Sequence, residues 1–254
     1  MLEVQPQLSK IIILAAGRGN RMRPLTDSLP KPLLKVRGVP LLTHHLLAFE
    51  RAGYERAHIN TCWLEEKIVS FYSQSANYRE HLLSTQMSLS FSTEGADFGF
   101  ALETAGGIIR ALPKLENIFW AVAGDIYIPG FDFKTEYATK LSNSPFLAHL
   151  FLVPNPPHNP NGDFALGSNG IALNLTGGGE QLEKFTYSSI GLFKKSFFQH
   201  PINSIEPGNP SGIKAPLAPL LRQAMSLGLV SAELMTSEWT DVGTPERLAQ
   251  LNIS

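Results

Sequence analysis

The most constraining feature of the sequence is a short apolar run at residues 10–15 (KIIILA), which leads directly into a glycine-containing loop. A β-branched run of this length, bounded by glycine, is typical of a strand buried on both faces of a parallel sheet. Further strand candidates are RAHIN (56–60), SLSFST (88–93) and IFWAVAGD (118–125). Because helical periodicity returns between them, the alternation predicts an α/β fold with a doubly wound, mostly parallel sheet.

The helices expected between these strands have recognisable ends. PLLTHHLLAFERAG (40–53) has a proline near its start and a glycine just after its last expected turn. LEEKIVSFY (64–72) is the second candidate. AGGIIRALPKL (105–115) is the third, and it should end before Pro113, since proline lacks the N–H that a helix interior needs.

Beyond residue 150 the composition changes. VPNPPHNPNGDF (153–164) and NLTGGGEQ (174–181) are rich in proline, glycine and asparagine, and only short strand candidates such as IALNL (171–175) accompany them. We therefore expect a small loop-rich lobe. Helical periodicity returns in APLLRQAMSLG (218–228), and EWTDVGTPERLAQLN (238–252) predicts a strand, a turn and a helix that starts at its proline.

The charge balance restricts the classes of partner. With 21 basic and 22 acidic residues, the net charge of −1 gives no reason to expect a nucleic-acid or membrane surface. Cys62 is the single cysteine, and no Cys/His cluster has zinc-like spacing, which suits a reducing compartment. The segment MLEVQPQLSK lacks the basic region of a signal peptide, and the apolar run after it stops at Ala16. We expect a cytoplasmic protein.

The loop after the first strand, LAAGRGNRMRPLT, combines glycines with arginines. Gly17 and Gly19 let backbone N–H groups approach an anion closely, because glycine adopts positive φ without steric cost. Arg18, Arg21 and Arg23 supply positive charge within a few residues. The combination predicts a phosphate-binding loop. The alternative is an ordinary turn with solvated arginines. A G-x-G pattern with no other feature favours this alternative.

Two common nucleotide-binding patterns do not fit this loop. A dinucleotide-binding motif needs a third glycine that opens a helix, whereas Pro24 and Pro30 are expected to keep this segment extended. A P-loop needs G-K-[ST], which does not occur here. The whole run of glycines, arginines and the Pro-Lys-Pro after them favours the phosphate-binding loop over the ordinary turn.

Two aspartates follow predicted strands. Asp125 ends IFWAVAGD, and Asp241 lies in WTDVG. Ligands of open α/β sheets bind outside the carboxyl ends of the strands, so Asp125 and the glycine loop should share one crevice. Carboxylate oxygens suit Mg²⁺, which usually binds one or two carboxylates together with substrate phosphates. The alternative for Asp241 is a helix cap ahead of Pro245.

The motif G-x-G-x-R-[ML]-x-P-L-T, followed by P-K-P-L, resembles the sugar-1-phosphate nucleotidyltransferases, also called nucleoside-diphosphate-sugar pyrophosphorylases. The resemblance implies that the glycine loop wraps the triphosphate of a nucleotide. The loop residues so assigned are Ala15, Ala16, Gly17 and Gly19. It places Arg21 on the β and γ phosphates and Lys31 at the reacting α-phosphate, roles that suit a planar fork and a compact charge. Asp125 and Asp241 match the Mg²⁺-binding positions of the family, and Asp125 joins Arg21 and Lys31 as a catalytic residue.

The same resemblance assigns residues to the two substrates. It places EGADFGFALETAGGI (94–108) against the base and ribose, although glycines that open a helix also form ordinary helix starts. The nucleotide-binding residues assigned there are Glu94, Thr104, Gly106 and Gly107. Asn155 and Asp163 line up with a similar loop of N-acetylmuramate-1-phosphate uridylyltransferases, which predicts that they bind the sugar. Glu183-Lys184-Phe185 departs from the Glu-Lys-Pro common in the family.

The resemblance to this uridylyltransferase subgroup extends over nearly the whole chain, including INTCWL, LETAGGI, NPNGDF, APLLRQAM and WTDVGTPERL. We expect one domain over 1–254, with a nucleotide-binding half at about 1–130 and a sugar-binding, metal-completing half at about 131–254. The implied reaction converts UTP and N-acetylmuramate α-1-phosphate into UDP-N-acetylmuramate and pyrophosphate, as in peptidoglycan recycling. The alternatives are a mannose- or glucose-1-phosphate nucleotidyltransferase and, in a different class, a non-catalytic nucleotide-sugar sensor.

Overall fold

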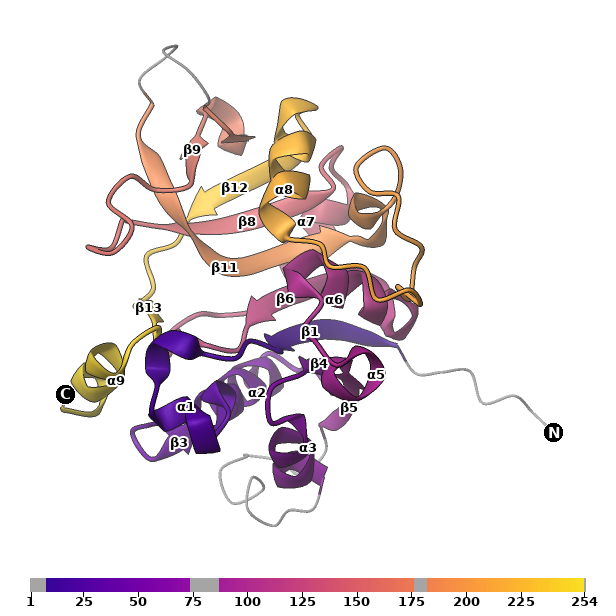
Figure 1. Ribbon diagram of the computed structural model, residues 1–254. Coiled ribbons are helices and arrows are strands. Elements are labelled where there is room, and N and C mark those ends of the chain that lie inside the picture. Colours follow the sequence, from indigo (N-terminus) through magenta and orange to yellow (C-terminus); the bar gives the residue numbers. More distant parts are fainter. Residues whose placement is uncertain (1–7, 74–86, 176–181, 254) are drawn as a thin grey trace.

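Four parallel strands form one half of the sheet, as the sequence predicts. The computed structural model describes residues 8–73, 87–175 and 182–253. The strands are β1 (Ser9–Ala15), β4 (Arg56–Thr61), β5 (Ser88–Thr93) and β6 (Leu115–Ala123). Their order across the sheet is β6-β1-β4-β5, and each neighbouring pair is parallel (Figure 1). All four strand predictions are confirmed, with small shifts at their ends.

The second half of the chain adds strands beside β6. They are β8 (Ala148–Val153), β9 (Phe164–Leu166), β10 (Ala172–Leu173), β11 (Lys184–Lys194) and β12 (Val230–Leu234). β11 runs antiparallel to β6, β8 and β9, while β12 is parallel to β8. The resulting nine-stranded sheet is mixed and mostly parallel, which confirms the predicted α/β class. The predicted strand at 171–175 is limited to β10, and residues 176–181 lie outside the described residues.

Short strand pairs lie outside the large sheet. They are β2 (Lys35–Val36) with β3 (Val39–Pro40), and β7 (Ile126–Tyr127) with β13 (Thr240–Asp241). The antiparallel β7–β13 pair connects the turn after β6 with the C-terminal segment, where Val242 N donates to the Asp125 carbonyl oxygen at 3.0 Å. Two aspartates that are far apart in the sequence are therefore brought to neighbouring backbone positions.

Helices cover both faces of the sheet (Figure 1). They are α2 (Leu41–Arg51), α3 (Glu65–Ser73), α5 (Glu94–Phe98), α6 (Glu103–Ala111), α7 (Thr135–Ser142) and α8 (Leu217–Ser226). The C-terminal helix α9 (Pro245–Ile253) packs in a separate small cluster with Val36 of β2. The predicted helices correspond to α2, α3, α6, α8 and α9, and α6 ends before Pro113 as expected. Within the part of the chain that the structure describes, no helix is long and apolar enough to cross a membrane.

The segment between Pro24 and Pro30 is not extended, contrary to the sequence-based expectation. A 3₁₀ turn at Asn20–Met22, the one-turn helix α1 (Leu25–Ser28) and a second 3₁₀ turn at Lys31–Leu33 follow the glycine loop. Proline interrupts a helix only in its interior, and Pro24 stands before the first residue of α1, where no helical N–H is required. Pro24 and Pro30 therefore stand at the boundaries between three short helical turns.

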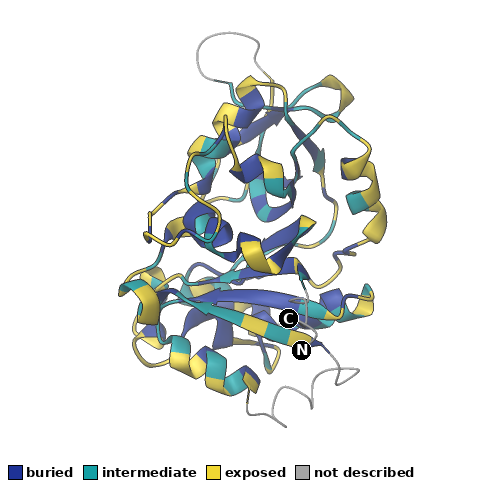
Figure 2. Cartoon of the chain, turned by 90° about the vertical axis from the view of Figure 1, so that its right-hand side faces the viewer, coloured by how far each residue is buried: buried dark blue, intermediate teal, exposed yellow. Residues whose placement is uncertain are grey.

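The alternation of β1 explains why its sequence is apolar throughout. Ile11 and Ile13 pack into one core cluster with Phe49 of α2, whereas Ile12 packs into a second cluster with residues of α6 and α8. All three isoleucines have no exposed surface, and the dark-blue central strands in Figure 2 show the same burial. A strand covered on both faces cannot alternate apolar with polar residues, which confirms the interpretation of residues 10–15.

Candidate active site

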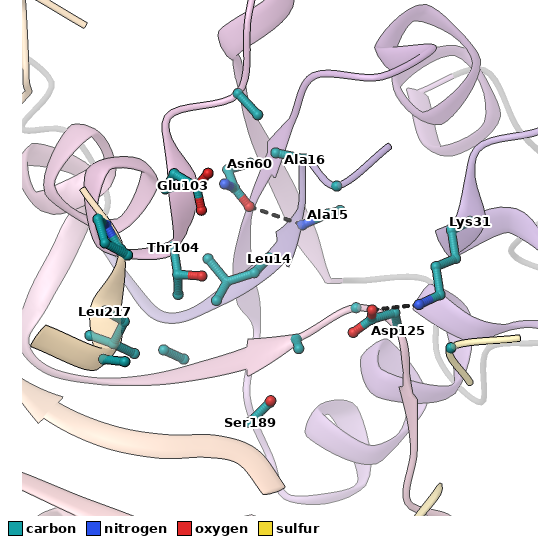
Figure 3. Close-up of a pocket in the computed structure, with 18 of the residues that line it drawn as sticks. Leu14, Ala15, Ala16, Lys31, Asn60, Glu103, Thr104, Asp125, Ser189 and Leu217 are labelled. Carbon is teal, nitrogen blue, oxygen red and sulfur yellow. Dashed lines mark hydrogen bonds and ion pairs between the residues drawn. The ribbon is translucent and has the colours of Figure 1, made fainter. Parts of the chain in front are cut away.

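A pocket of about 770 Å³ opens at the carboxyl ends of β1 and β6 (Figure 3). The glycine loop, the start of α6, the helix α8 and the strand β11 form its walls. Most residues predicted from the sequence line it: Ala15, Ala16, Gly17, Gly19, Arg21, Lys31, Thr104, Asp125 and Asp163. The predicted residues that do not line it are Glu94, Gly106, Gly107, Asn155 and Asp241.

Lys31 and Asp125 form an ion pair at the pocket wall (Figure 3). The Lys31 Nζ lies 2.6 Å from Asp125 Oδ2. The Lys31 side chain is only 7% exposed, whereas that of Asp125 is 40% exposed, so the carboxylate faces the pocket while the ammonium is largely covered. A buried ammonium needs a partner, and Asp125 provides one at the edge of the pocket.

Gly19 is the position in the loop that requires glycine. Its φ is +68°, and a Cβ there would lie 3.0 Å from Thr26 Cγ2 and 3.3 Å from Lys31 Cβ. The Thr26 hydroxyl donates to the Gly19 carbonyl oxygen at 2.8 Å, which closes the loop onto α1. The absence of a side chain at Gly19 thus lets the loop pack against the Lys31 stem.

The three arginines of the loop have different surroundings. The Arg18 guanidinium lies 4.4 Å from the ring centroid of Trp63, so a cation–π contact holds it beside the pocket. Arg23 pairs with Asp27 at 2.8 Å and does not line the pocket. Arg21 lines the pocket and has no hydrogen bond or ion pair with another described residue, so its donors are available to a ligand.

Asn60 and Glu94 fix the backbone of the pocket from behind. Asn60 Oδ1 accepts from Ala15 N at 3.0 Å, and its Nδ2 donates to Glu94 Oε1 at 2.9 Å. The other carboxylate oxygen of Glu94 accepts from Leu102 N at 2.8 Å. Burial raises the pKa of Glu94, and these hydrogen bonds partly oppose the rise. Glu94 is fully buried, so it braces the loop and the start of α6 without facing the pocket.

The two glycines of α6 are close-packing positions. A Cβ on Gly107 would lie 2.6 Å from Asn60 Nδ2 and 2.7 Å from Glu94 Oε1. A Cβ on Gly106 would lie 2.8 Å from the carbonyl oxygen of Ile213. Both positions are therefore closed to any side chain, and Thr104 is the residue of this group whose surface reaches the pocket.

The predicted sugar-binding residues lie at the two ends of the loop before β9, and both are fixed to β11. Asp163 lines the pocket, and its Oδ2 accepts from Tyr187 N of β11 at 2.8 Å. Asn155 does not line the pocket. Its Nδ2 donates to the Lys184 carbonyl oxygen at 2.8 Å and its Oδ1 accepts from the Thr186 hydroxyl at 3.0 Å. Asn155 therefore fixes the loop that presents Asp163.

Asp241 already has two nitrogen-bearing side chains beside it. Its Oδ2 lies 2.8 Å from Arg247 Nη1 and 3.3 Å from His158 Nε2. Among the described residues, no group of three or more His, Cys, Asp or Glu side chains could hold a metal ion by itself. The oxygen donors of Asp125 and Asp241 fit a cation that takes one or two carboxylates and completes its shell with water and substrate.

Sequence reasoning missed several pocket residues. Asn60 lies in a buried strand, where a polar residue is itself a signal. Glu103 and Ser189 have φ of +64° and +65°, a conformation that residues with a Cβ rarely adopt, and it arises from tertiary packing. Arg222 of α8 also lines the pocket, and in the sequence it resembles any polar residue of an amphipathic helix.

The comparisons with known proteins agree with this architecture. A mannose-1-phosphate guanylyltransferase of Mycobacterium tuberculosis is 31% identical over 106 residues, which cover 42% of this chain and 26% of that protein. A solved Bacillus anthracis structure, provisionally assigned as a glucose-1-phosphate thymidylyltransferase in complex with a sucrose, superposes with a TM-score of 0.73. It is 19% identical and covers 96% of this chain and 94% of that chain, so it shows the shared fold alone.

A longer match defines the family. An N-acetylmuramate alpha-1-phosphate uridylyltransferase of Neisseria meningitidis serogroup B is 40% identical over 243 residues, covering 95% of this chain and 96% of that protein. The family model described as nucleotidyl transferase matches residues 10–253, which include the glycine loop, both aspartates and α8. The chain therefore belongs to the nucleotidyl transferase family and is a sugar-1-phosphate nucleotidyltransferase.

Proposed function

We propose that the protein converts UTP and N-acetylmuramate α-1-phosphate into UDP-N-acetylmuramate and pyrophosphate, a reaction of peptidoglycan recycling. A phosphate oxygen of the sugar 1-phosphate attacks the α-phosphorus of UTP and forms the new P–O bond. The bond from the α-phosphorus to the bridging oxygen breaks, and its electron pair leaves with pyrophosphate. The full-length 40% identity to the Neisseria meningitidis uridylyltransferase supports this choice of substrates. Because UTP is a cytoplasmic metabolite, we place the reaction in the cytoplasm.

The ion pair between Lys31 and Asp125 carries the proposal. It lies in the same pocket as Gly17, Gly19 and Arg21, where the carboxyl ends of β1 and β6 meet. The attacking group is already an anion, so the reaction needs no protein nucleophile. The residues have to hold two negatively charged substrates in line and offset their repulsion, a role that suits Arg21 and Lys31.

Asp125 and Asp241 would hold the Mg²⁺ that the family assignment implies. Their carboxylate oxygens suit this cation, and the hydrogen bond between Val242 N and the Asp125 carbonyl brings the two segments together. When bound, Mg²⁺ supplies positive charge to the phosphates. Arg247 and His158 contact Asp241 Oδ2 and orient this carboxylate, while Lys31 orients Asp125.

The two halves of the chain bind different substrates in this proposal. Ala15, Ala16, Gly17, Gly19 and Thr104 contact the nucleotide, and Glu94, Gly106 and Gly107 act indirectly by fixing the backbone behind it. Asp163 contacts the sugar and Asn155 fixes its loop. The binding residues thus divide into those with surface in the pocket and those that position them.

Pyrophosphate release from a panel of triphosphates and sugar 1-phosphates tests the proposal. We expect the highest kcat/KM with UTP and N-acetylmuramate α-1-phosphate. Robust turnover of mannose 1-phosphate with none of the muramate would refute it, and the similarity to a mannose-1-phosphate guanylyltransferase makes this the competing activity. Asp125→Ala and Asp241→Ala should abolish Mg²⁺-dependent turnover in a folded protein, and full activity of both variants would refute the metal assignment. A non-catalytic nucleotide-sugar sensor would bind UTP without releasing pyrophosphate.

A further inference from the structure

We propose that Arg222 binds a carboxylate on the sugar substrate, namely the lactyl carboxylate that distinguishes N-acetylmuramate from neutral N-acetylhexosamines. The inference rests on the proposed function and deepens it, because it assigns sugar discrimination to one side chain. Arg222 lines the pocket from α8, in the second half of the chain.

The packing of α8 fixes where Arg222 points. Leu221 and Ala224 are 1% and 0% exposed and belong to the core cluster on this face of the sheet. Gln223 donates through Nε2 to the Pro201 carbonyl oxygen at 2.9 Å, which fixes the outer face of the helix. Arg222 is exposed and its surface borders the pocket, so the helix presents it there from a rigid support.

The charge of Arg222 is not neutralised within the part of the chain that the structure describes, where it makes no hydrogen bond, ion pair or ring contact. The other cations of the pocket wall differ from it. Lys31 is paired with Asp125, Arg18 stacks over Trp63, and Arg21 belongs to the glycine loop. Arg222 is therefore a guanidinium with free donors at the pocket wall that α8 forms.

The surroundings of Arg222 favour an anion carried on an otherwise uncharged group. Its neighbours on the same pocket wall are small or apolar: Pro216, Leu217, Ala218 and Leu221. The phosphate of the sugar must lie near Lys31 and Asp125 to reach the α-phosphorus, and these two side chains are paired with each other and not with Arg222. A second anionic group on the same substrate would satisfy the guanidinium of Arg222.

N-acetylmuramate provides such a group. Its lactyl ether carries a carboxylate and a methyl group, whereas N-acetylglucosamine, glucose and mannose have only a hydroxyl at that carbon. A guanidinium donates two parallel N–H bonds to a carboxylate, and the methyl group suits the apolar residues around it. The wall formed by α8 thus matches both parts of the lactyl group.

Steady-state kinetics of Arg222→Met and Arg222→Lys test the inference, with Gln223→Met as a control on the same helix outside the pocket lining. We expect Arg222→Met to raise KM for N-acetylmuramate α-1-phosphate by about 10–100-fold, the loss expected for a charged hydrogen-bonded pair. KM for UTP should not change. For Arg222→Lys, KM for N-acetylmuramate α-1-phosphate should lie between the values for the unmodified enzyme and Arg222→Met, because lysine keeps the charge but cannot donate two parallel N–H bonds.

A substrate analogue makes the test independent of how the variants fold. For the unmodified enzyme, KM for the methyl ester of the lactyl carboxylate should exceed KM for the acid by the same factor that Arg222→Met produces. For Arg222→Met, KM should be the same for ester and acid. Equal KM values for ester and acid with the unmodified enzyme would overturn the inference. It would also be overturned if Arg222→Met changed KM for UTP and left KM for the sugar phosphate unchanged. An enzyme that does not turn over the muramate at all would instead refute the proposed function.

Discussion

Gly107→Ala is the substitution whose cost the structure defines most sharply. The new methyl would lie 2.6 Å from Asn60 Nδ2 and 2.7 Å from Glu94 Oε1, atoms that are hydrogen-bonded to each other at 2.9 Å. Neither side chain can move into solvent, because Asn60 is 2% exposed and Glu94 is 0% exposed. The methyl must therefore displace α6 or break the hydrogen bond.

The expected destabilisation follows from three contributions. Overpacking costs about 1–3 kcal/mol, and a buried polar group that loses its partner costs about 1–3 kcal/mol more. The higher helix propensity of alanine offsets this loss by about 1 kcal/mol of stability. The net loss is about 1–5 kcal/mol in the free energy of unfolding, which for a chain of this size corresponds to a fall in Tm of roughly 3–15 °C.

The function of Gly107→Ala should change together with its stability. Asn60 also accepts from Ala15 N at 3.0 Å, so displacing Asn60 moves the first residue of the nucleotide loop and should raise KM for the triphosphate. Urea unfolding and steady-state kinetics measure the two effects, with Gly130→Ala as the control because a methyl group at that position would have open space within 4 Å. In an Asn60→Ala background the substitution should cost less. If Gly107→Ala matched Gly130→Ala in both Tm and KM, the packing argument would be refuted.

Three further predictions concern single side chains. Glu103→Gly should be more stable than Glu103→Ala by about 1 kcal/mol in urea unfolding, because φ is +64° there and a Cβ is unfavourable in that region; equal stability would contradict this. The raised pKa of Glu94 means that the folded state holds this proton more tightly, so stability should fall as pH rises above the ordinary value of 4.5. Glu94→Gln should remove that part of the pH dependence, and an unchanged slope of Tm against pH would show another group to be responsible. Lys31→Ala should lower kcat by about 10²–10³, the effect of losing one preorganised charge, and a change of less than about threefold would make Lys31 a bystander.

The sequence predicted the alternation of strands and helices because buried strands and amphipathic helices have distinct periods. The expectation that the segment between Pro24 and Pro30 is extended was wrong, because the prolines stand at the starts of short helical turns. The predicted pocket residues that line the pocket lie mainly in the glycine loop, whose residues are contiguous. Asn60 could be predicted only with the knowledge that its strand lies beside β1, since its role depends on the contact with Ala15.

The sequence by itself determined the fold class and the family and predicted a phosphate-binding loop, because each depends on residues close together in the chain. Only the tertiary structure decided which residues face the pocket and which support it. Glu94, Gly107 and Asn155 were themselves predicted to bind substrate, yet packing keeps them out of the pocket lining, while Arg222 reaches it from a helix near the C-terminus. The physical reason is that the direction of a side chain depends on the contacts of its whole element with the core, and those contacts join residues far apart in the sequence.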